Sequence, residues 1–175
     1  MIARLDTQEW LRIIAESASE VATVALGFDN CEIRNQGSSV PDGLIGAYLP
    51  LGTNEQQMQV GFLSDPAGCQ KLAKALLGMA EDEDDLAPAD LSDAISELAN
   101  VVAGGIKRRV TGGVEIKLGL PLFVNGSVQP NEHLVIMTAA LKLGSVDALI
   151  LFATPRNSIV THLSNAGIPA VRVAK

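Results

Sequence analysis

Residues 90–110 read DLSDAISELANVVAGGIKRRV, and this stretch decides the fold because its apolar side chains recur with the period of an α-helix. In a helix from Asp90 to Val110, at about 100° per residue, they fall within about 80° of arc. These buried positions are Leu91, Ile95, Leu98, Val102 and Ile106. The opposite face carries Asp93, Glu97 and Asn100, spaced by four and three residues, and Gly104 continues the line. The sequence therefore predicts one core face and one short polar stripe.

The stripe is costly for a face that only needs to be soluble. A glycine in a helix interior costs about 1 kcal/mol relative to alanine, so Gly104 and Gly105 together cost about 2 kcal/mol. Gly105 projects toward the core side, where it favours the close approach of a neighbouring element. The stripe is compatible with a solvated face, with a surface that enters another protein's pocket, or with a packing surface.

The whole chain has the composition of a globular protein, and we take residues 1–175 as a single domain. It has 47% hydrophobic and 19% charged residues, a net charge of −7 and a pI near 4.7. The negative charge makes nucleic acid and anionic membranes poor partners. No signal-peptide pattern or membrane-length apolar run is present, so we expect a cytoplasmic protein. The one charge block, Glu81–Asp85, is expected to be an exposed loop.

The other periodic segments predict an α/β (α+β) domain with a mostly antiparallel sheet of about six strands and helices on one face. The tight turn at 52–54 indicates a hairpin, and Asp65 with Pro66 indicates a helix start that Gly78 ends. Helices are expected at 7–28, 66–78 and 154–167, and strands at 44–51, 57–63, 114–118, 134–142 and 147–153.

The arrangement of the strands can also be anticipated. Strands 44–51 and 134–142 carry near-continuous apolar runs and are expected to be central. Pro121 and Pro130 confine the segment between them to an edge or a loop. Leu-Pro-Leu-Gly at 49–52 and Leu-Lys-Leu-Gly at 141–144 are each followed by a phenylalanine and then a proline. This echo predicts two pseudo-symmetric strand–strand–helix halves.

Several kinds of catalytic site are not indicated. The sequence lacks the phosphate-binding patterns GxxxxGK[ST] and GxGxxG and the nucleophile pattern GxSxG. Cys31 and Cys69 are far apart and are expected to be buried free thiols, while His133 and His162 lie in unrelated segments without partners. Aromatic residues make up 3%, too few for a base-stacking platform. The best remaining polar pair is the acid and the amide of the stripe.

The segment Asp93–Gly104, DAISELANVVAG, followed by Pro121 and by Val-Asn-Gly at 124–126, resembles the signature of the CheC/CheX/FliY phosphatases of bacterial chemotaxis. That family carries an acid or serine, then Glu, then Asn on a long helix, with a proline a little over twenty residues later. Asp93, Glu97, Asn100 and Pro121 fill these positions. The earlier helix at 65–79 has no Glu/Asn pair, so the chain resembles the single-site CheX type.

The resemblance implies a phosphatase that hydrolyses the phosphoaspartate of a CheY-like response regulator. It implies that Asn100 orients the attacking water and that Glu97 pairs with the regulator's conserved lysine, with Asp93, Gly104 and Pro121 in the partner-binding surface. It also implies no cofactor of the chain's own, since the Mg²⁺ belongs to the regulator, and it implies a homodimer.

Two alternatives use the same residues. A non-catalytic CheX-like module would recognise a signalling partner through the helix without turnover. A structural dimerisation domain would use Gly104 and Gly105 as packing positions and would bury the stripe. Exposed Glu97 and Asn100 side chains favour docking to a partner, whereas a buried Asn100 amide favours packing.

Overall fold

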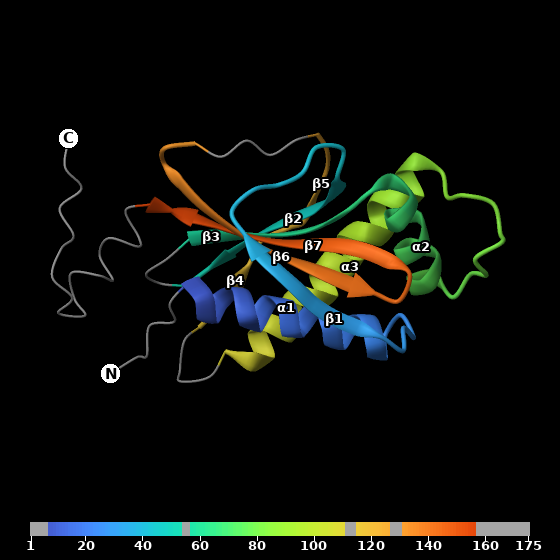
Figure 1. Ribbon diagram of the computed structural model, residues 1–175, viewed down its shortest axis with the longest axis horizontal. Coiled ribbons are helices and arrows are strands. Elements are labelled where there is room, and N and C mark those ends of the chain that lie inside the picture. Colours follow the sequence, from blue (N-terminus) through green and yellow to red (C-terminus); the bar gives the residue numbers. More distant parts are fainter. Residues whose placement is uncertain (1–6, 54–56, 111–114, 127–130, 157–175) are drawn as a thin grey trace, which may run out of the picture.

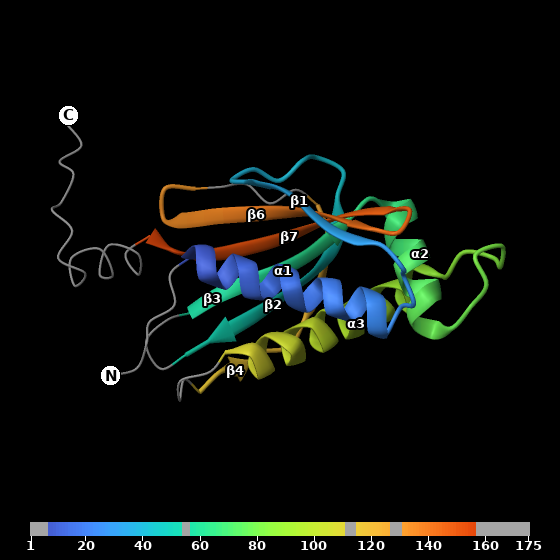
Figure 2. The same cartoon turned by 60° about the horizontal axis from the view of Figure 1, so that its bottom comes forward.

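The computed structural model describes residues 7–53, 57–110, 115–126 and 131–156. Within these ranges three helices cover one face of a seven-stranded sheet (Figures 1 and 2). The helices are α1 (Thr7–Val24), α2 (Pro66–Leu77) and α3 (Pro88–Arg109). The strands are β1 (Cys31–Gly37), β2 (Ile45–Gly52), β3 (Gln57–Ser64), β4 (Lys117–Leu118), β5 (Leu122–Asn125), β6 (Leu134–Leu143) and β7 (Val146–Pro155).

The sheet has the order β1-β6-β7-β3-β2-β4, and β5 also pairs with β2, so β4 and β5 share one edge. Every strand pair is antiparallel, which confirms the predicted fold class. The expectation that β2 and β6 are central is wrong, because β3 and β7 form the middle pair. An apolar run indicates that a strand is covered on both faces. Every interior strand is covered in this way, so the run does not identify the middle pair.

The two long hairpins confirm the predicted pseudo-symmetry of the strands. The β2–β3 hairpin and the β6–β7 hairpin meet through their second strands, with Gly61 opposite Leu151. Helix α2 follows the first hairpin. The predicted start of the last helix is wrong, since Thr154 and Pro155 still belong to β7. The helix predicted beyond them lies outside the described residues from residue 157 onward.

Local sequence signals set most of the element ends. Asp65 accepts a hydrogen bond from the Gly68 amide at the start of α2, and Gly78 ends that helix in the left-handed conformation, with φ 69°. Helix α1 ends at Val24 rather than at Phe28, because the chain turns at Gly27, whose φ is also 69°. Strand β4 is shorter than the predicted 114–118 segment, of which residue 114 lies outside the described ranges.

The main core lies between the helices and the sheet. It joins the buried sides of all three helices to one face of the strands, and the Trp10 and Phe152 rings stack there with centroids 6.2 Å apart. A smaller cluster around Tyr48, Leu63 and Leu151 covers the opposite face. None of the helices in the described ranges is long and apolar enough to cross a membrane.

A buried lysine organises the acidic segment between α2 and α3. Lys74 is only 6% exposed, and its Nζ donates to the carbonyl oxygens of Glu83 at 2.6 Å and Glu81 at 3.4 Å. The same ammonium pairs with an Asp85 carboxylate oxygen at 3.0 Å. The loop 81–85 is exposed, as predicted. The Lys74 ammonium beneath it holds the loop backbone in place, and with it the segment that leads into α3.

Replacing this lysine should therefore cost stability. We expect Lys74→Met to lower the free energy of unfolding by about 1–3 kcal/mol, because it leaves two backbone carbonyls without their donor. The matched control is Lys71→Met in the same helix, whose exposed ammonium donates to the Ser145 hydroxyl at 3.2 Å and to no other group in the described ranges. That variant should stay within about 0.5 kcal/mol of the wild type in urea denaturation. Equal losses for the two variants would contradict the anchoring role.

Candidate functional site

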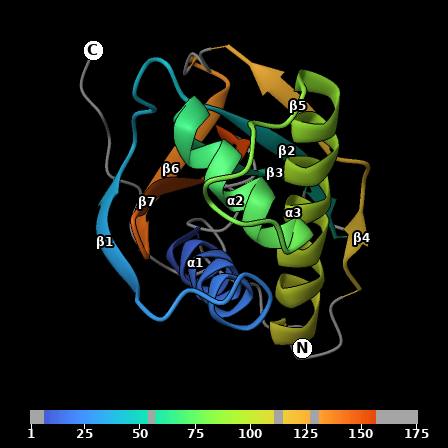
Figure 3. The ribbon, with the colours of Figure 1, turned by 90° about the vertical axis from the view of Figure 1, so that its right-hand side faces the viewer.

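Helix α3 is held rigidly between α1 and the β4/β5 edge of the sheet. Gly105 faces α1 so closely that a Cβ there would lie 3.1 Å from the Cβ of Ser17. Arg109 forms an ion pair with Glu20 of α1, and its guanidinium lies 3.4 Å from the Ser17 hydroxyl oxygen. Figure 3 shows α1 and α2 on one side of α3 and β4 on the other, with β5 near one end of the helix. The helix therefore presents a fixed outer face.

That outer face carries the predicted stripe. Asp93, Glu97 and Asn100 are all exposed, and Gly104 is partly exposed one turn further along. The Asn100 side-chain amide donates to Glu97 Oε2 at 3.4 Å. The structure thus brings the acid and the amide side by side at the surface, as the interpretation of the stripe as a docking surface requires. The packing alternative required a buried Asn100 amide, and the chain's own fold does not bury it.

The chemistry available at this face is that of a positioned amide and an unneutralised carboxylate. No lysine or arginine in the described part of the chain forms an ion pair with Glu97 or Asp93, so both carboxylates can meet a cation from another molecule. The amide offers a donor and an acceptor together. Between Asp93 and Glu97 in the sequence the one polar side chain is that of Ser96, which is short and half-buried.

The two adjacent glycines have different roles. Gly105 is buried against α1 and is a packing position. A Cβ at Gly104 would have only a guanidinium nitrogen of Arg108 nearby, at 3.8 Å, and open space otherwise. Packing within the described residues therefore gives no reason for glycine at 104. Close approach of a partner to this surface would be such a reason.

Alanine substitutions should separate these roles. Gly104→Ala is expected to raise the free energy of unfolding by about 0.5–1 kcal/mol, because it adds helix propensity without a clash. Gly105→Ala is expected to lower it by about 1 kcal/mol, because the new methyl group would crowd the Ser17 side chain of α1 and push the two helices apart. Thermal unfolding of the two variants measures this. A destabilised Gly104→Ala protein would show that position 104 packs internally.

Pro121 lies in the short segment between β4 and β5 and is partly buried. This segment runs beside α3 along the edge of the sheet (Figure 3). The amide of its Gly119 donates to the carbonyl oxygen of Pro50 in β2 at 2.8 Å, which ties the segment to the sheet. Pro121 therefore belongs to the same side of the molecule as the stripe, on a neighbouring element.

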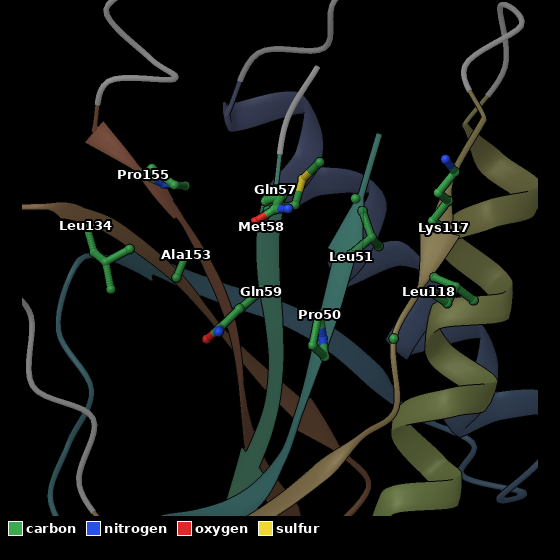
Figure 4. A pocket seen from close by; sticks show the side chains of 12 residues that line it. Pro50, Leu51, Gln57, Met58, Gln59, Lys117, Leu118, Leu134, Ala153 and Pro155 are labelled. Atoms are coloured by element: carbon green, nitrogen blue, oxygen red, sulfur yellow. The ribbon is translucent and has the colours of Figure 1, made fainter. Parts of the chain in front are cut away.

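One hollow among the described residues lies at the end of the sheet and has little reactive chemistry. A groove of about 450 Å³ opens at the end of the sheet, with lining side chains from β2, β3, β4, β6 and β7 (Figure 4). Among the described residues that line it, Lys117 is the only ionisable one. Burial raises the pKa of the Cys69 thiol to about 12, so this cysteine is a packing residue. No group of three His, Cys, Asp or Glu side chains among the described residues is placed to hold a metal ion.

Sequence reasoning missed one feature of this side of the molecule. Leu118, Leu120 and Leu122 are 39%, 88% and 66% exposed, although leucines are usually expected in the core. The spacing of two along a Leu-Gly-Leu-Pro-Leu segment was the available signal. It could have indicated an apolar edge beside the stripe.

Comparison with known proteins supports the predicted resemblance. The profile of the family described as chemotaxis phosphatase CheX matches residues 53–136, which include the whole of α3 and the β4–β5 segment. Among the curated protein sequences compared, none matches the chain. The family match therefore covers the part of the chain that carries the stripe.

Solved structures share the fold. CheX from Vibrio vulnificus superposes with a TM-score of 0.68 at 16% identity, covering 83% of this chain and 99% of that one. CheX in a CheX–CheY–BeF3–Mg²⁺ complex from Borrelia burgdorferi gives 0.65 at 17% identity, covering 87% and 99%. FliY from Thermotoga maritima gives 0.62 at 12% identity, covering 93% and 97%. The resemblance to the CheC/CheX/FliY proteins is thus confirmed in sequence over 53–136 and in fold over most of the chain.

Proposed function

Because this chain is CheX-like in both sequence and fold, we propose that it is a phosphatase for the phosphoaspartate of a CheY-like receiver domain. The observation that carries the proposal is the Glu97–Asn100 pair, a carboxylate and an amide in contact on the exposed face of a rigid helix. The Borrelia CheX has a structure in complex with CheY, which makes a receiver the natural class of partner to test.

In the proposed complex the helix α3 enters the receiver's phosphorylation site. The Asn100 carboxamide accepts a hydrogen bond from a water molecule and holds its oxygen in line with the phosphorus–carboxyl oxygen bond. The water oxygen bonds to phosphorus as that bond breaks, the aspartate leaves as a carboxylate, and the water proton goes to the released phosphate. Glu97 pairs with a receiver lysine and fixes the register of the helix. The receiver's Mg²⁺ neutralises charge on the phosphoryl oxygens.

No general base is needed for this role, which suits the residues present. Phosphoryl transfer passes through a loose transition state with little deprotonation of the nucleophile, so positioning the water is the main requirement. A hundredfold acceleration corresponds to about 2.7 kcal/mol, which one well-placed polar group can supply in a site closed to solvent. The open space at Gly104 allows the receiver to approach within contact of the helix. The homodimer remains a prediction of the resemblance.

The test is phosphate release from a panel of phosphorylated receiver domains, with and without the full chain. We expect at least one receiver to lose phosphate about a hundredfold faster in its presence. A non-catalytic module would bind a receiver and leave its phosphate lifetime unchanged, and that result would refute the phosphatase. Acceleration that needs neither Glu97 nor Asn100 would refute the site.

A further inference from the structure

Three exposed leucines follow one another at every second position around the edge of the sheet, and we call them the leucine ridge (Leu118, Leu120, Leu122). Leu118 lies opposite Leu51, whose side chain belongs to the core on the helix side. Leu122 lies opposite Tyr48, which belongs to the cluster on the other face. Opposed residues in an antiparallel pair share a face, so the ridge passes from one face to the other, with Leu120, at 88% exposed, between them.

The ridge borders the stripe on the side of Asn100. In α3, Gly105 marks the flank that faces α1. At about 100° per residue, Ser96 and Ala103 lie on the other flank, toward the β4/β5 edge, and both are small. On the same wheel Asn100 is displaced toward this flank and Glu97 toward the α1 side. Ser96 is partly exposed and Ala103 is buried by the chain itself, and the segment that carries the leucines runs beside α3 (Figure 3), so a molecule that covers Asn100 can reach the sheet edge past short side chains.

The structure argues against the addition of a strand from a second copy of the chain at this edge. An added strand needs a continuous row of free backbone groups, but β4 has two residues, β5 has four, and Pro121 lies between them. The Gly119 amide is already bonded to the Pro50 carbonyl oxygen. The opposite edge, β1, is the longer one, with seven residues. The ridge thus offers side chains rather than a backbone edge.

We propose that the leucine ridge is a second contact region for the receiver domain, which meets it with an apolar patch beside its phosphorylation site. This inference rests on the proposed function for the location of the partner, and it extends that function by naming what holds the receiver. In this arrangement Glu97 fixes the position of the helix on the receiver and Asn100 positions the water. Burial of the exposed leucine side chains of the ridge strengthens binding. Substituting the ridge should weaken binding and leave the chemical step unchanged.

The experiment compares Leu120→Ser with the wild type on a receiver domain in two forms. Binding to the beryllofluoride-loaded receiver is measured by titration calorimetry, and turnover is measured on the phosphorylated receiver at saturating concentration. We expect the Kd of Leu120→Ser to rise about tenfold or more, with kcat unchanged and with rescue by Leu120→Met. The control is Val24→Ser, a residue 79% exposed at the end of α1 beside the β1 edge, which should bind like the wild type.

The outcomes separate this inference from the proposed function. If the wild type dephosphorylates the receiver and Leu120→Ser binds it with an unchanged Kd, the proposed role of the leucine ridge is refuted and the proposed phosphatase function stands. Wild-type binding without turnover would overturn the phosphatase, and the Kd comparison would still decide the ridge. A weakened self-association of Leu120→Ser in sedimentation, with receiver binding intact, would assign the ridge to a second copy and overturn the inference. If the wild type binds none of the receivers, both the proposed phosphatase function and the proposed role of the leucine ridge are refuted.

Discussion

Replacing Asn100 by alanine is expected to slow dephosphorylation of the cognate receiver about a hundredfold, to the receiver's own rate, without loss of folding or binding. The carboxamide is exposed, and its one hydrogen bond to the described residues, to Glu97, is long at 3.4 Å, so its removal costs little stability. Its proposed task is to hold a water molecule in the transition state. Loss of an interaction made only in the transition state lowers kcat and leaves the dissociation constant unchanged.

The matched control for this variant is Asn35→Ala. Asn35 is also an exposed asparagine, but it lies on β1 at the opposite edge of the sheet. It should retain the wild-type rate of phosphate release. A Kd that rises while kcat is retained in Asn100→Ala would assign the amide to binding rather than to positioning water.

Replacing Glu97 by alanine is expected to act mainly on affinity. Docking would bury the carboxylate against a receiver lysine, and truncating one partner of such a pair costs about 2–5 kcal/mol. The Kd for the phosphorylated or beryllofluoride-loaded receiver should therefore rise about thirtyfold or more. Once the receiver is saturated, the remaining turnover should exceed that of Asn100→Ala, because the water-positioning amide is still present. Stopped-flow phosphate release over a range of receiver concentrations separates the two constants.

Glu32→Ala is the control for the acid, since Glu32 is exposed on β1 and makes only a long contact of 3.7 Å with Arg34. It should bind the receiver like the wild type, because an exposed charge far from the interface contributes little to affinity. If Glu32→Ala and Glu97→Ala weaken binding equally, the effect is one of net charge rather than of a specific pair. That result would remove Glu97 from the proposed interface.

The sequence predicts the parts of this structure that depend on local patterns. A helix is predicted at 90–110 and α3 spans Pro88–Arg109, because the apolar spacing from Leu91 to Ile106 is unbroken over about four turns. Asp65 and Gly78 mark the ends of α2 because capping is decided within one turn. The stripe follows from the same helical spacing, and its exposure follows from the burial of the opposite face.

What could not be predicted depends on distant partners. The middle position of β3 and β7 arises from a pairing between Gly61 and Leu151, and the periodicity of a single strand does not encode its neighbours. The burial of Lys74 does not follow from its own helix, because a lysine is normally exposed unless it is paired, and its partners are backbone carbonyls and the Asp85 carboxylate in the loop after α2. The exposure of Leu120 depends on its place at the sheet edge, where few residues are available to cover it.

The decay of a phosphorylated CheY-like receiver, mixed with a saturating amount of the chain in a single turnover, tests the proposal that Asn100 positions the attacking water. On this proposal, decay with the wild type is about a hundredfold faster than for the receiver alone, and decay with Asn100→Ala bound to the same extent proceeds at the receiver's own rate. Equal decay with the wild type and with Asn100→Ala would contradict it.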